Sequence, residues 1–178
     1  LTLDARLRQL FNVIQMGNDP EKIARLADAR PGGITRFVRA DVEAAAEGLR
    51  LLTSRSQIPL LISGDLEWGA IGIPGGTALP NQLGLAATGS TVTPVVDINS
   101  AFRSTIVATR SYGSDIDTIK AQARVNVGTF QKNGIAACIK HWPGEGFDDR
   151  DQHLVTTINP LSVADWQARF GNVYRDLI

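Results

Sequence analysis

The chain has 178 residues, of which 43% are hydrophobic and 20% charged, and 18 basic side chains balance 18 acidic ones. This balance gives no reason to expect nucleic acid or an anionic membrane as a partner, because a surface that binds either would show as a basic excess or stripe. No apolar run approaches 18 residues and there is no signal-peptide pattern, so we expect no membrane span. The sequence begins at Leu1 without a Met, which leaves the compartment open, with the cytoplasm favoured over secretion.

The first third of the chain is predicted to alternate helices with strands. Apolar spacing of i, i+3 and i+4 predicts an amphipathic helix over 3–15 with Thr2 as its N-cap. Asp41 is expected to cap a later helix, and the continuous apolar run 58–63 is typical of a strand buried on both faces. The predicted elements are helix 3–15, helix 20–29, strand 34–38, helix 42–54 and strand 58–63.

The same alternation continues to the end of the chain. We predict strand 91–96, helix 114–133 with Gly134 at its C-cap, strand 135–139, and a final helix that begins after Ser162. Cys138 lies in an apolar run, so it is expected to be a small buried residue rather than a nucleophile. Apolar strands that alternate with amphipathic helices indicate an α/β fold of about four parallel β/α units with right-handed crossovers.

Polar side chains follow three of the predicted strands, where parallel β/α folds place their reactive groups. Any one of them could equally be an ordinary turn residue. The residues are Asp65 and Glu67, Asp97 and Asn99, and Lys140 and His141.

The segment 140–153 contains both histidines of the chain together with a lysine and several acidic side chains. If its backbone is extended, Asp151 and His153 project to the same side and can hydrogen-bond, which would prepare His153 for proton transfer. The alternative is a solvated Asp/His pair on a loop. A metal site is disfavoured, because no helical His-x-x-x-His pair is present. No dinucleotide motif, phosphate loop or Gly-x-Ser-x-Gly elbow occurs, so no cofactor is expected.

The run Lys-His-Trp-Pro-Gly-Glu-Gly over 140–146, followed by Asp151-x-His153, resembles a known signature. It is similar to the Lys-His-Phe-Pro-Gly-His-Gly…Asp-Ser-His pattern of glycoside hydrolase family 3, in its β-N-acetylglucosaminidase (NagZ-like) branch. Further segments follow the family's order, so the resemblance runs along essentially the whole chain. These are 1–11 (opening helix), 31–34 (first strand), 64–69 (loop after the second strand), 93–99 and 109–115.

The resemblance implies a (β/α)8 barrel of TIM type that removes terminal β-linked N-acetylhexosamine with retention, through a covalent glycosyl-enzyme intermediate. By position, His153 would be the general acid/base and Asp151 its orienting partner. The residues that would hold sugar hydroxyls are Asp65, Arg110, Lys140 and His141. The expected partner is a small saccharide or amino-sugar glycoconjugate, in carbohydrate metabolism such as cell-wall recycling.

Several departures from the family pattern bear on these expectations. Glu145 stands where the signature has histidine, Gln152 where it has serine, and Trp142 where it has phenylalanine. Ala70 and Ile71 replace a Gly-Gly-Arg-Val stretch, so an arginine is missing and the sugar specificity is left open.

Length is a further departure, because a complete barrel takes about 250 residues. We therefore expect residues 1–178 to form one partial barrel domain, with residues absent near 89–90 and after 178, and with the nucleophilic aspartate outside this chain. Two alternatives remain: a β-glucosidase of the same family, or a non-catalytic sugar-binding remnant.

Overall fold

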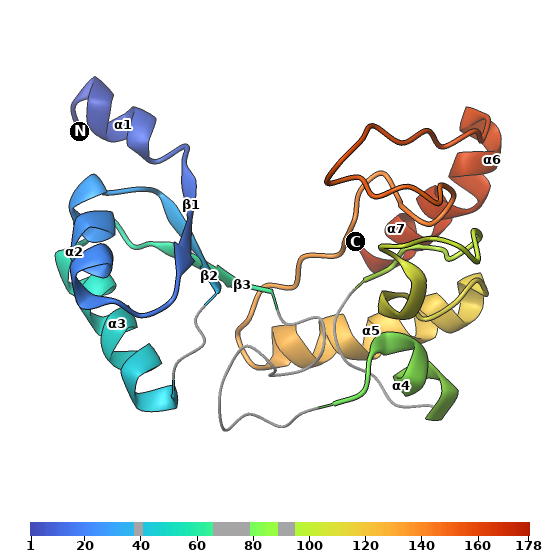
Figure 1. Cartoon of the computed structure of the whole chain (residues 1–178), viewed down its shortest axis with the longest axis horizontal. Helices are drawn as coiled ribbons and strands as arrows, with labels where there is room; N and C mark the ends of the chain where they lie inside the picture. The colour runs from blue at the N-terminus through green and yellow to red at the C-terminus, as the bar shows by residue number, and fades with distance from the viewer. Residues whose placement is uncertain (38–40, 66–78, 89–94) are drawn as a thin grey trace. The chain divides into compact units, whose positions relative to one another are not determined.

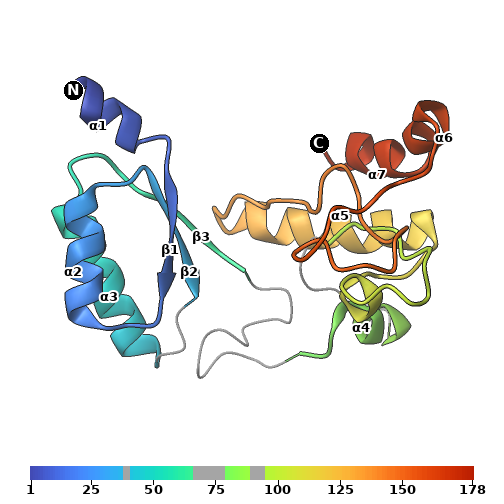
Figure 2. The same cartoon turned by 45° about the horizontal axis from the view of Figure 1, so that its top comes forward.

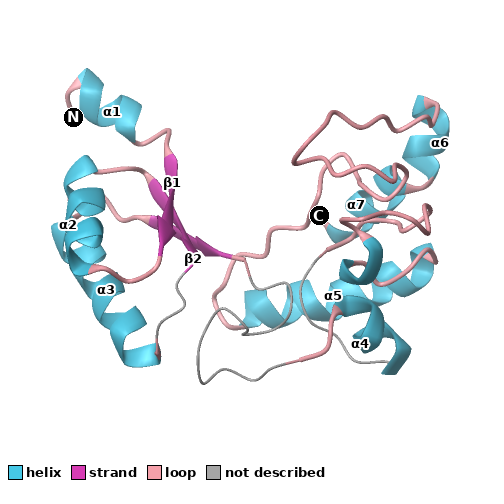
Figure 3. Ribbon diagram, in the orientation of Figure 1, coloured by secondary structure: helices cyan, strands magenta, loops and turns pink. Residues whose placement is uncertain are grey.

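The computed structural model describes residues 1–37, 41–65, 79–88 and 95–178. These residues fall into two compact units, one within 1–65 and the other within 79–178, and each is described by itself. Figure 1 colours the chain in order, and Figure 3 distinguishes its helices from its strands. Within the described ranges we find no helix with the length and apolar character that a membrane span requires.

The first unit is a three-stranded parallel sheet in the order β1-β2-β3. Val13 pairs with Ile34, and Ile34 pairs with Ile62, so successive strands lie side by side as β/α units require. In chain order the elements are α1 (Leu3–Arg8), β1 (Asn12–Met16), α2 (Pro20–Ala29), β2 (Gly33–Phe37), α3 (Val42–Arg55) and β3 (Leu61–Gly64).

Helices α2 and α3 lie on the same side of this sheet (Figures 1 and 2). Their buried residues Ile23, Ala27 and Leu52 pack against Ile34 of β2. Local sequence sets where the helices begin: Asp19 accepts hydrogen bonds from two backbone amides of α2, and Asp41 accepts one from Ala44. The expected cap residues Thr2 and Asp41 are thus confirmed.

The helix expected over 3–15 is wrong beyond Arg8. The chain turns after α1, and residues 12–16 form β1. The first strand of the sheet is therefore β1, and not the segment 31–34 that resembles the family's first strand. Two hydrogen bonds from the segment after α2 stabilise this turn. The amide of Gly32 donates to the carbonyl of Arg8, and the amide of Gly33 donates to the carbonyl of Phe11. These partners are more than 20 positions away, so periodicity within 3–15 contains no sign of them.

The strand expected over 58–63 also differs from the prediction. It begins at Leu61, and all four residues of β3 are exposed rather than buried on both faces. Apolar side chains on β1 and β3 are exposed as well, namely Ile14, Met16, Leu61 and Ile62.

The second unit contains one long helix, several short ones, and loops that pack on them. Its elements are α4 (Gln82–Thr88), η1 (Ala108–Arg110), α5 (Ile116–Lys132), α6 (Val163–Ala168) and α7 (Phe170–Leu177). The core of this unit joins Val96 and Ile98 to Ile119 of α5 and to Phe170 and Val173 of α7. The helix predicted over 114–133 is confirmed with Asp115 as its N-cap; its C-cap is Asn133 rather than the predicted Gly134, which follows at φ +74°.

Three predictions for this unit are corrected. Within the part of the chain that the structure describes, residues 135–139 form no strand, and Lys140 makes an isolated bridge with Val95. Cys138 is exposed rather than buried. The final helix is interrupted at Arg169, where φ is −105° and ψ −88°, although Ser162 caps its first part as predicted.

Some predictions fall outside the described residues. These are strand positions 91–94 and Val38, Glu67, the departure at Ala70 and Ile71, and the break expected at Gly89 and Ser90.

Candidate active site

Two strand-end segments of the second unit lie together and carry the site. Val95 bridges Lys140, and the amide of Val96 donates to the carbonyl of Lys140 at 2.8 Å. Asp97 follows Val96, and His141 follows Lys140. Asp97 and His141 are therefore neighbours in space, although 44 positions separate them in the sequence.

Asp97 is fully buried and organises the loop that follows His141. Its Oδ1 accepts hydrogen bonds from the amides of His141 (3.2 Å) and Glu145 (2.8 Å), and its Oδ2 accepts one from Nδ1 of His141 (2.6 Å). Sequence reasoning placed Asp97 at a strand end but gave it no role. The signal available was a carboxylate directly after an apolar run, which by itself also fits a turn.

The network assigns the tautomer of His141. Arginine only donates hydrogen bonds, so the contact of 3.2 Å between a guanidinium nitrogen of Arg110 and Nε2 of His141 makes Nε2 an acceptor. The proton of the neutral ring is then on Nδ1, where Asp97 accepts it. Arg110 is itself held by the carbonyl of Ile106 at 3.1 Å.

Asp151 and His153 form the pair that the spacing predicts. Oδ1 of Asp151 accepts hydrogen bonds from the amide of His153 at 2.8 Å and from its Nδ1 at 2.7 Å. The backbone is a turn rather than extended, because the amides of Leu154 and Val155 donate back to the carbonyl of Asp151. The side chains meet by reaching across this turn, not by alternating along a strand.

The electrostatics of this pair favour a charged aspartate beside an accessible imidazole. The hydrogen bond from the amide of His153 lowers the pKa of the Asp151 carboxyl most, and the hydrogen bond from the His153 side chain lowers it further. The charge of Arg110 also lowers this pKa. The side chain of His153 is 73% exposed, against 27% for Asp151. With Nδ1 held by the aspartate, Nε2 of His153 is the nitrogen that can exchange a proton with a substrate.

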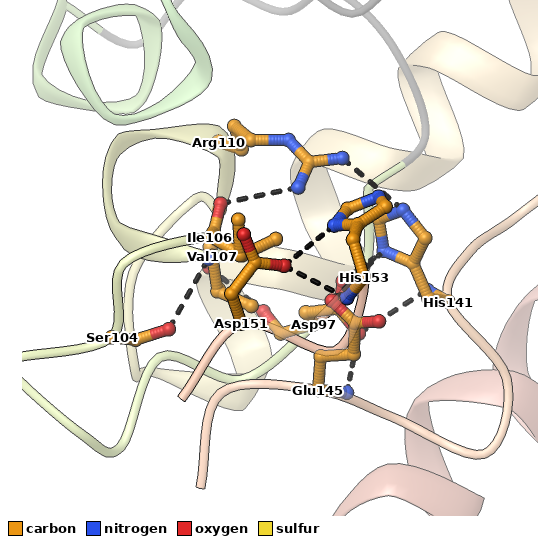
Figure 4. Close-up of polar contacts among 10 residues, drawn as sticks. Asp97, Ser104, Ile106, Val107, Arg110, His141, Glu145, Asp151 and His153 are labelled. Carbon is orange, nitrogen blue, oxygen red and sulfur yellow. Dashed lines mark hydrogen bonds and ion pairs between the residues drawn. The ribbon is translucent and has the colours of Figure 1, made fainter. Parts of the chain in front are cut away.

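The structure brings four of the six candidate residues into one cluster. Figure 4 shows Arg110 and His141 with the Asp151 and His153 pair, and Arg110 interacts electrostatically with Asp151. Lys140 adjoins His141 in the chain, and its carbonyl makes the contact to Val96. Asp65 follows β3 in the first unit, where it is exposed.

Aromatic packing holds the loop that carries His141 and Glu145. Trp142 makes edge contacts with Trp166 of α6 at 5.2 Å and with Tyr174 of α7 at 4.9 Å between ring centroids. The indole nitrogen of Trp166 donates to the carbonyl of Pro143 at 2.7 Å. The loop also approaches the preceding segment closely at Gly146, where a Cβ would lie 2.3 Å from the carbonyl oxygen of Ile98.

Asp97, His141 and Glu145 place ligand-type atoms within 4.8 Å of one another, but this arrangement does not fit a cation. Three N–H donors already point at the oxygens of Asp97. His141 has a proton on Nδ1, and its Nε2 accepts from a guanidinium that would repel a metal ion. The cluster is better described as a hydrogen-bonded support.

The sequence and the fold are similar to those of known carbohydrate enzymes. Residues 89–178 match the model of the glycosyl hydrolase family 3 N-terminal domain. A β-N-acetylglucosaminidase/β-glucosidase of Cellulomonas fimi is 38% identical over 199 residues, which cover 98% of this chain and 35% of that protein. A β-hexosaminidase of Neisseria meningitidis is 26% identical over 92% of this chain and 43% of its own length.

Two solved structures resemble the whole chain. A β-glucoside phosphorylase, BglX, bound to 2FGlc has a TM-score of 0.88 and 30% identity, with 99% of this chain and 36% of that chain covered. A family 3 β-N-acetylglucosaminidase of Paenibacillus has a TM-score of 0.82 and 26% identity, with 100% and 40% covered. The chain therefore spans less than half the length of these relatives.

Proposed function

This chain belongs to glycosyl hydrolase family 3 and has that family's TIM-barrel type of β/α fold, and from this premise we propose that it is part of a retaining β-N-acetylhexosaminidase. The observation that carries the proposal is the hydrogen bond of 2.7 Å between Asp151 and the exposed His153. In this proposal both units belong to one partial barrel domain, residues 1–178.

His153 is proposed as the general acid/base. Its protonated Nε2 donates to the glycosidic oxygen as the bond to the anomeric carbon breaks, and the neutral ring later takes a proton from the incoming water. Asp151 stabilises the imidazolium and keeps Nδ1 as the donor to itself, so that the same nitrogen always faces the substrate.

A nucleophilic aspartate must attack the opposite face of the anomeric carbon, and we propose that it lies beyond the 178 residues. The lengths of the relatives support this, because the chain covers only 35% of the Cellulomonas fimi protein. Their alignment runs over 199 positions, so that relative also has residues without a counterpart within this chain.

Arg110, Lys140, His141 and Asp65 are proposed to hold the hydroxyl groups of the terminal sugar. A hydroxyl both donates and accepts, so one placed between Arg110 and His141 could accept from the guanidinium and donate to Nε2, replacing their direct contact. Charged donors of this kind make the stronger hydrogen bonds to sugars.

The test uses the full-length protein with aryl β-N-acetylglucosaminide and matched aryl β-glucoside. We expect faster hydrolysis of the N-acetylglucosaminide, and a 10²- to 10⁴-fold lower kcat for His153→Ala. The loss should shrink with a dinitrophenyl leaving group, which departs without a proton. Undiminished activity of His153→Ala would refute the assignment, and equal or better glucoside turnover would favour a β-glucosidase. Saccharide binding without turnover would favour a sugar-binding remnant.

Phosphorolysis is a second candidate, favoured by the TM-score of 0.88 to a β-glucoside phosphorylase. An imidazole acid/base suits it, because a neutral or cationic ring does not repel an approaching phosphate as a carboxylate would. The measurement is the rate with and without inorganic phosphate, together with the product. A sugar 1-phosphate formed faster than the free sugar would support phosphorolysis, and a phosphate-independent rate would exclude it.

A further inference from the structure

Glu145 lies within the candidate site but has no role in the mechanism above. Its side chain is 20% exposed, and among the described residues its buried Oε2 has no hydrogen-bond partner. The carboxyl oxygen lies 3.8 Å from Nδ1 of His141, but the proton on that nitrogen is already given to Asp97 at 2.6 Å. A buried carboxylate oxygen without a donor is costly, so its presence needs an explanation.

The titratable and charged groups that interact electrostatically with Glu145 come from several segments of the second unit. They are Asp97, Arg110, His141, His153 and, from α7, Tyr174. Asp97 only accepts hydrogen bonds, and the guanidinium of Arg110 contacts His141 and the carbonyl of Ile106. Figure 4 shows the side chain of Glu145 directed toward His141 rather than away from the cluster.

The surroundings of Glu145 are those proposed to bind the sugar. Arg110 and His141 are candidate hydroxyl partners, and His153 is the candidate acid/base. The donor that a buried carboxyl oxygen lacks here is what a sugar hydroxyl supplies. The Glu145 side chain is 20% exposed although Oε2 itself is buried, so a side-chain rotation would bring Oε2 to a hydroxyl of a ring that contacts Arg110 or His141.

We propose that Glu145 is a specificity-determining residue whose Oε2 accepts a hydrogen bond from one hydroxyl of the sugar held beside Arg110 and His141. The inference rests on the proposed function, because it assigns a contact in the same sugar site. Burial raises the pKa of Glu145, Asp97 adds to this effect, and His141, Arg110 and His153 oppose it. A donated hydroxyl would stabilise the ionised form, so sugar binding should strengthen as the pH rises through the range in which Glu145 titrates.

The experiment is a double-mutant cycle on the full-length protein. Wild type, Glu145→Ala and the isosteric Glu145→Gln are compared on the preferred aryl glycoside and on its analogues that each lack one hydroxyl. Asp149→Asn is the matched control, because it removes an exposed carboxylate from the same loop. Thermal unfolding confirms that each variant is folded before its kinetics are measured.

We expect one deoxy analogue to lose about 10- to 100-fold in kcat/KM with wild type but only a few-fold with Glu145→Ala. Asp149→Asn should behave like wild type throughout. The rise of sugar affinity with pH should disappear in Glu145→Gln, which a purely structural role would not produce. If each deoxy analogue lowers kcat/KM by the same factor in wild type and in Glu145→Ala, Glu145 does not contact the sugar and the inference is wrong.

Failure of the inference can be told apart from failure of the proposed function. Turnover that depends on His153 but shows no coupling to Glu145 leaves the function standing and overturns the inference. If no turnover occurs, the same comparison is made with binding affinities of the sugar and its deoxy analogues, measured by calorimetry. Coupling between Glu145 and one hydroxyl in these affinities supports Glu145 as a sugar contact, and no coupling overturns the inference.

Discussion

Asp97 accepts three hydrogen bonds from the loop that carries His141 and Glu145, and its carboxylate is fully buried. In the proposed site it would act on a sugar only through His141, which makes it a positioning residue in that proposal. Its effect is to orient the imidazole and assign its tautomer, which the Lys-His motif by itself does not specify.

Replacement of Asp97 by Asn should disturb this arrangement. An amide nitrogen would face an N–H donor, and a buried unsatisfied donor costs about 1–3 kcal/mol. We expect a lower Tm and at least a ~10-fold lower kcat/KM, measured by thermal unfolding and aryl glycoside hydrolysis. Asp149→Asn, an exposed substitution on the same loop, should change neither. A variant as stable and active as wild type would show that the three hydrogen bonds are not needed.

Glu145 predicts a pH dependence of stability with a defined sign. Its pKa is raised above the ordinary value of 4.5, so the folded state holds the proton more tightly than the unfolded state. The stability that this contributes is present below pH 4.5 and is lost as the pH rises through the folded-state pKa. We therefore expect Glu145→Gln to have the wild-type Tm at pH 4 and a higher Tm at pH 7.5.

Asp148 is the matched control of opposite sign. Hydrogen bonds from Arg150 lower the pKa of its carboxyl, so its contribution is present above the ordinary pKa of 3.8 and is lost on acidification. Asp148→Asn should lower the Tm more at pH 7.5 than at pH 2, because acidification removes part of the contribution. A lower Tm for Glu145→Gln at pH 7.5 would mean that the ionised carboxylate stabilises the fold.

The loops of the second unit depend on close backbone approaches more than on regular strands. The carbonyl of Gly146 accepts hydrogen bonds from the amides of Ser100 and Ala101, and its φ is +102°. These contacts bring the loop of residues 140–153 against the segment that follows Asp97. An element without strand pairing is thus still held in a defined place.

Gly146→Ala should break this approach. The new Cβ would meet the carbonyl oxygen of Ile98, and the positive φ adds strain, so we expect a loss of about 1–3 kcal/mol or more with reduced activity. Gly128→Ala in α5 is the control, because a Cβ there meets nothing within 4 Å. Alanine at a helix interior should stabilise by about 0.5–1 kcal/mol. Equal Tm changes for the two variants would contradict this interpretation.

Large apolar side chains are exposed on the strands of the first unit. Leu61 is 78% exposed and Met16 70%, both on strands of the first unit. Exposed apolar side chains on strands favour pairing with other surfaces or self-association.

A polypeptide limited to these 178 residues should therefore self-associate. We expect ANS fluorescence and a concentration-dependent mass in light scattering, both reduced by Leu61→Lys. The full-length protein should show neither if its additional residues cover these side chains. A monomeric 178-residue polypeptide that does not bind ANS would contradict the expectation.

The sequence by itself determined the features that depend on neighbouring residues. The caps at Thr2, Asp41 and Ser162, the first turns of the helices that follow them, and the Asp151 and His153 pair all involve partners within four positions. The family signature was readable for the same reason, because its residues are contiguous.

Only the tertiary structure decided the features that join distant segments. Residues 12–16 form a strand because β2, about 20 positions later, pairs with them, and a local pattern of helical spacing could not indicate this. Likewise the tautomer of His141 depends on Asp97, 44 positions away, and on Arg110, 31 positions away. Burial of the Glu145 carboxyl is also a product of this packing, since burial depends on what surrounds a side chain in space rather than along the chain.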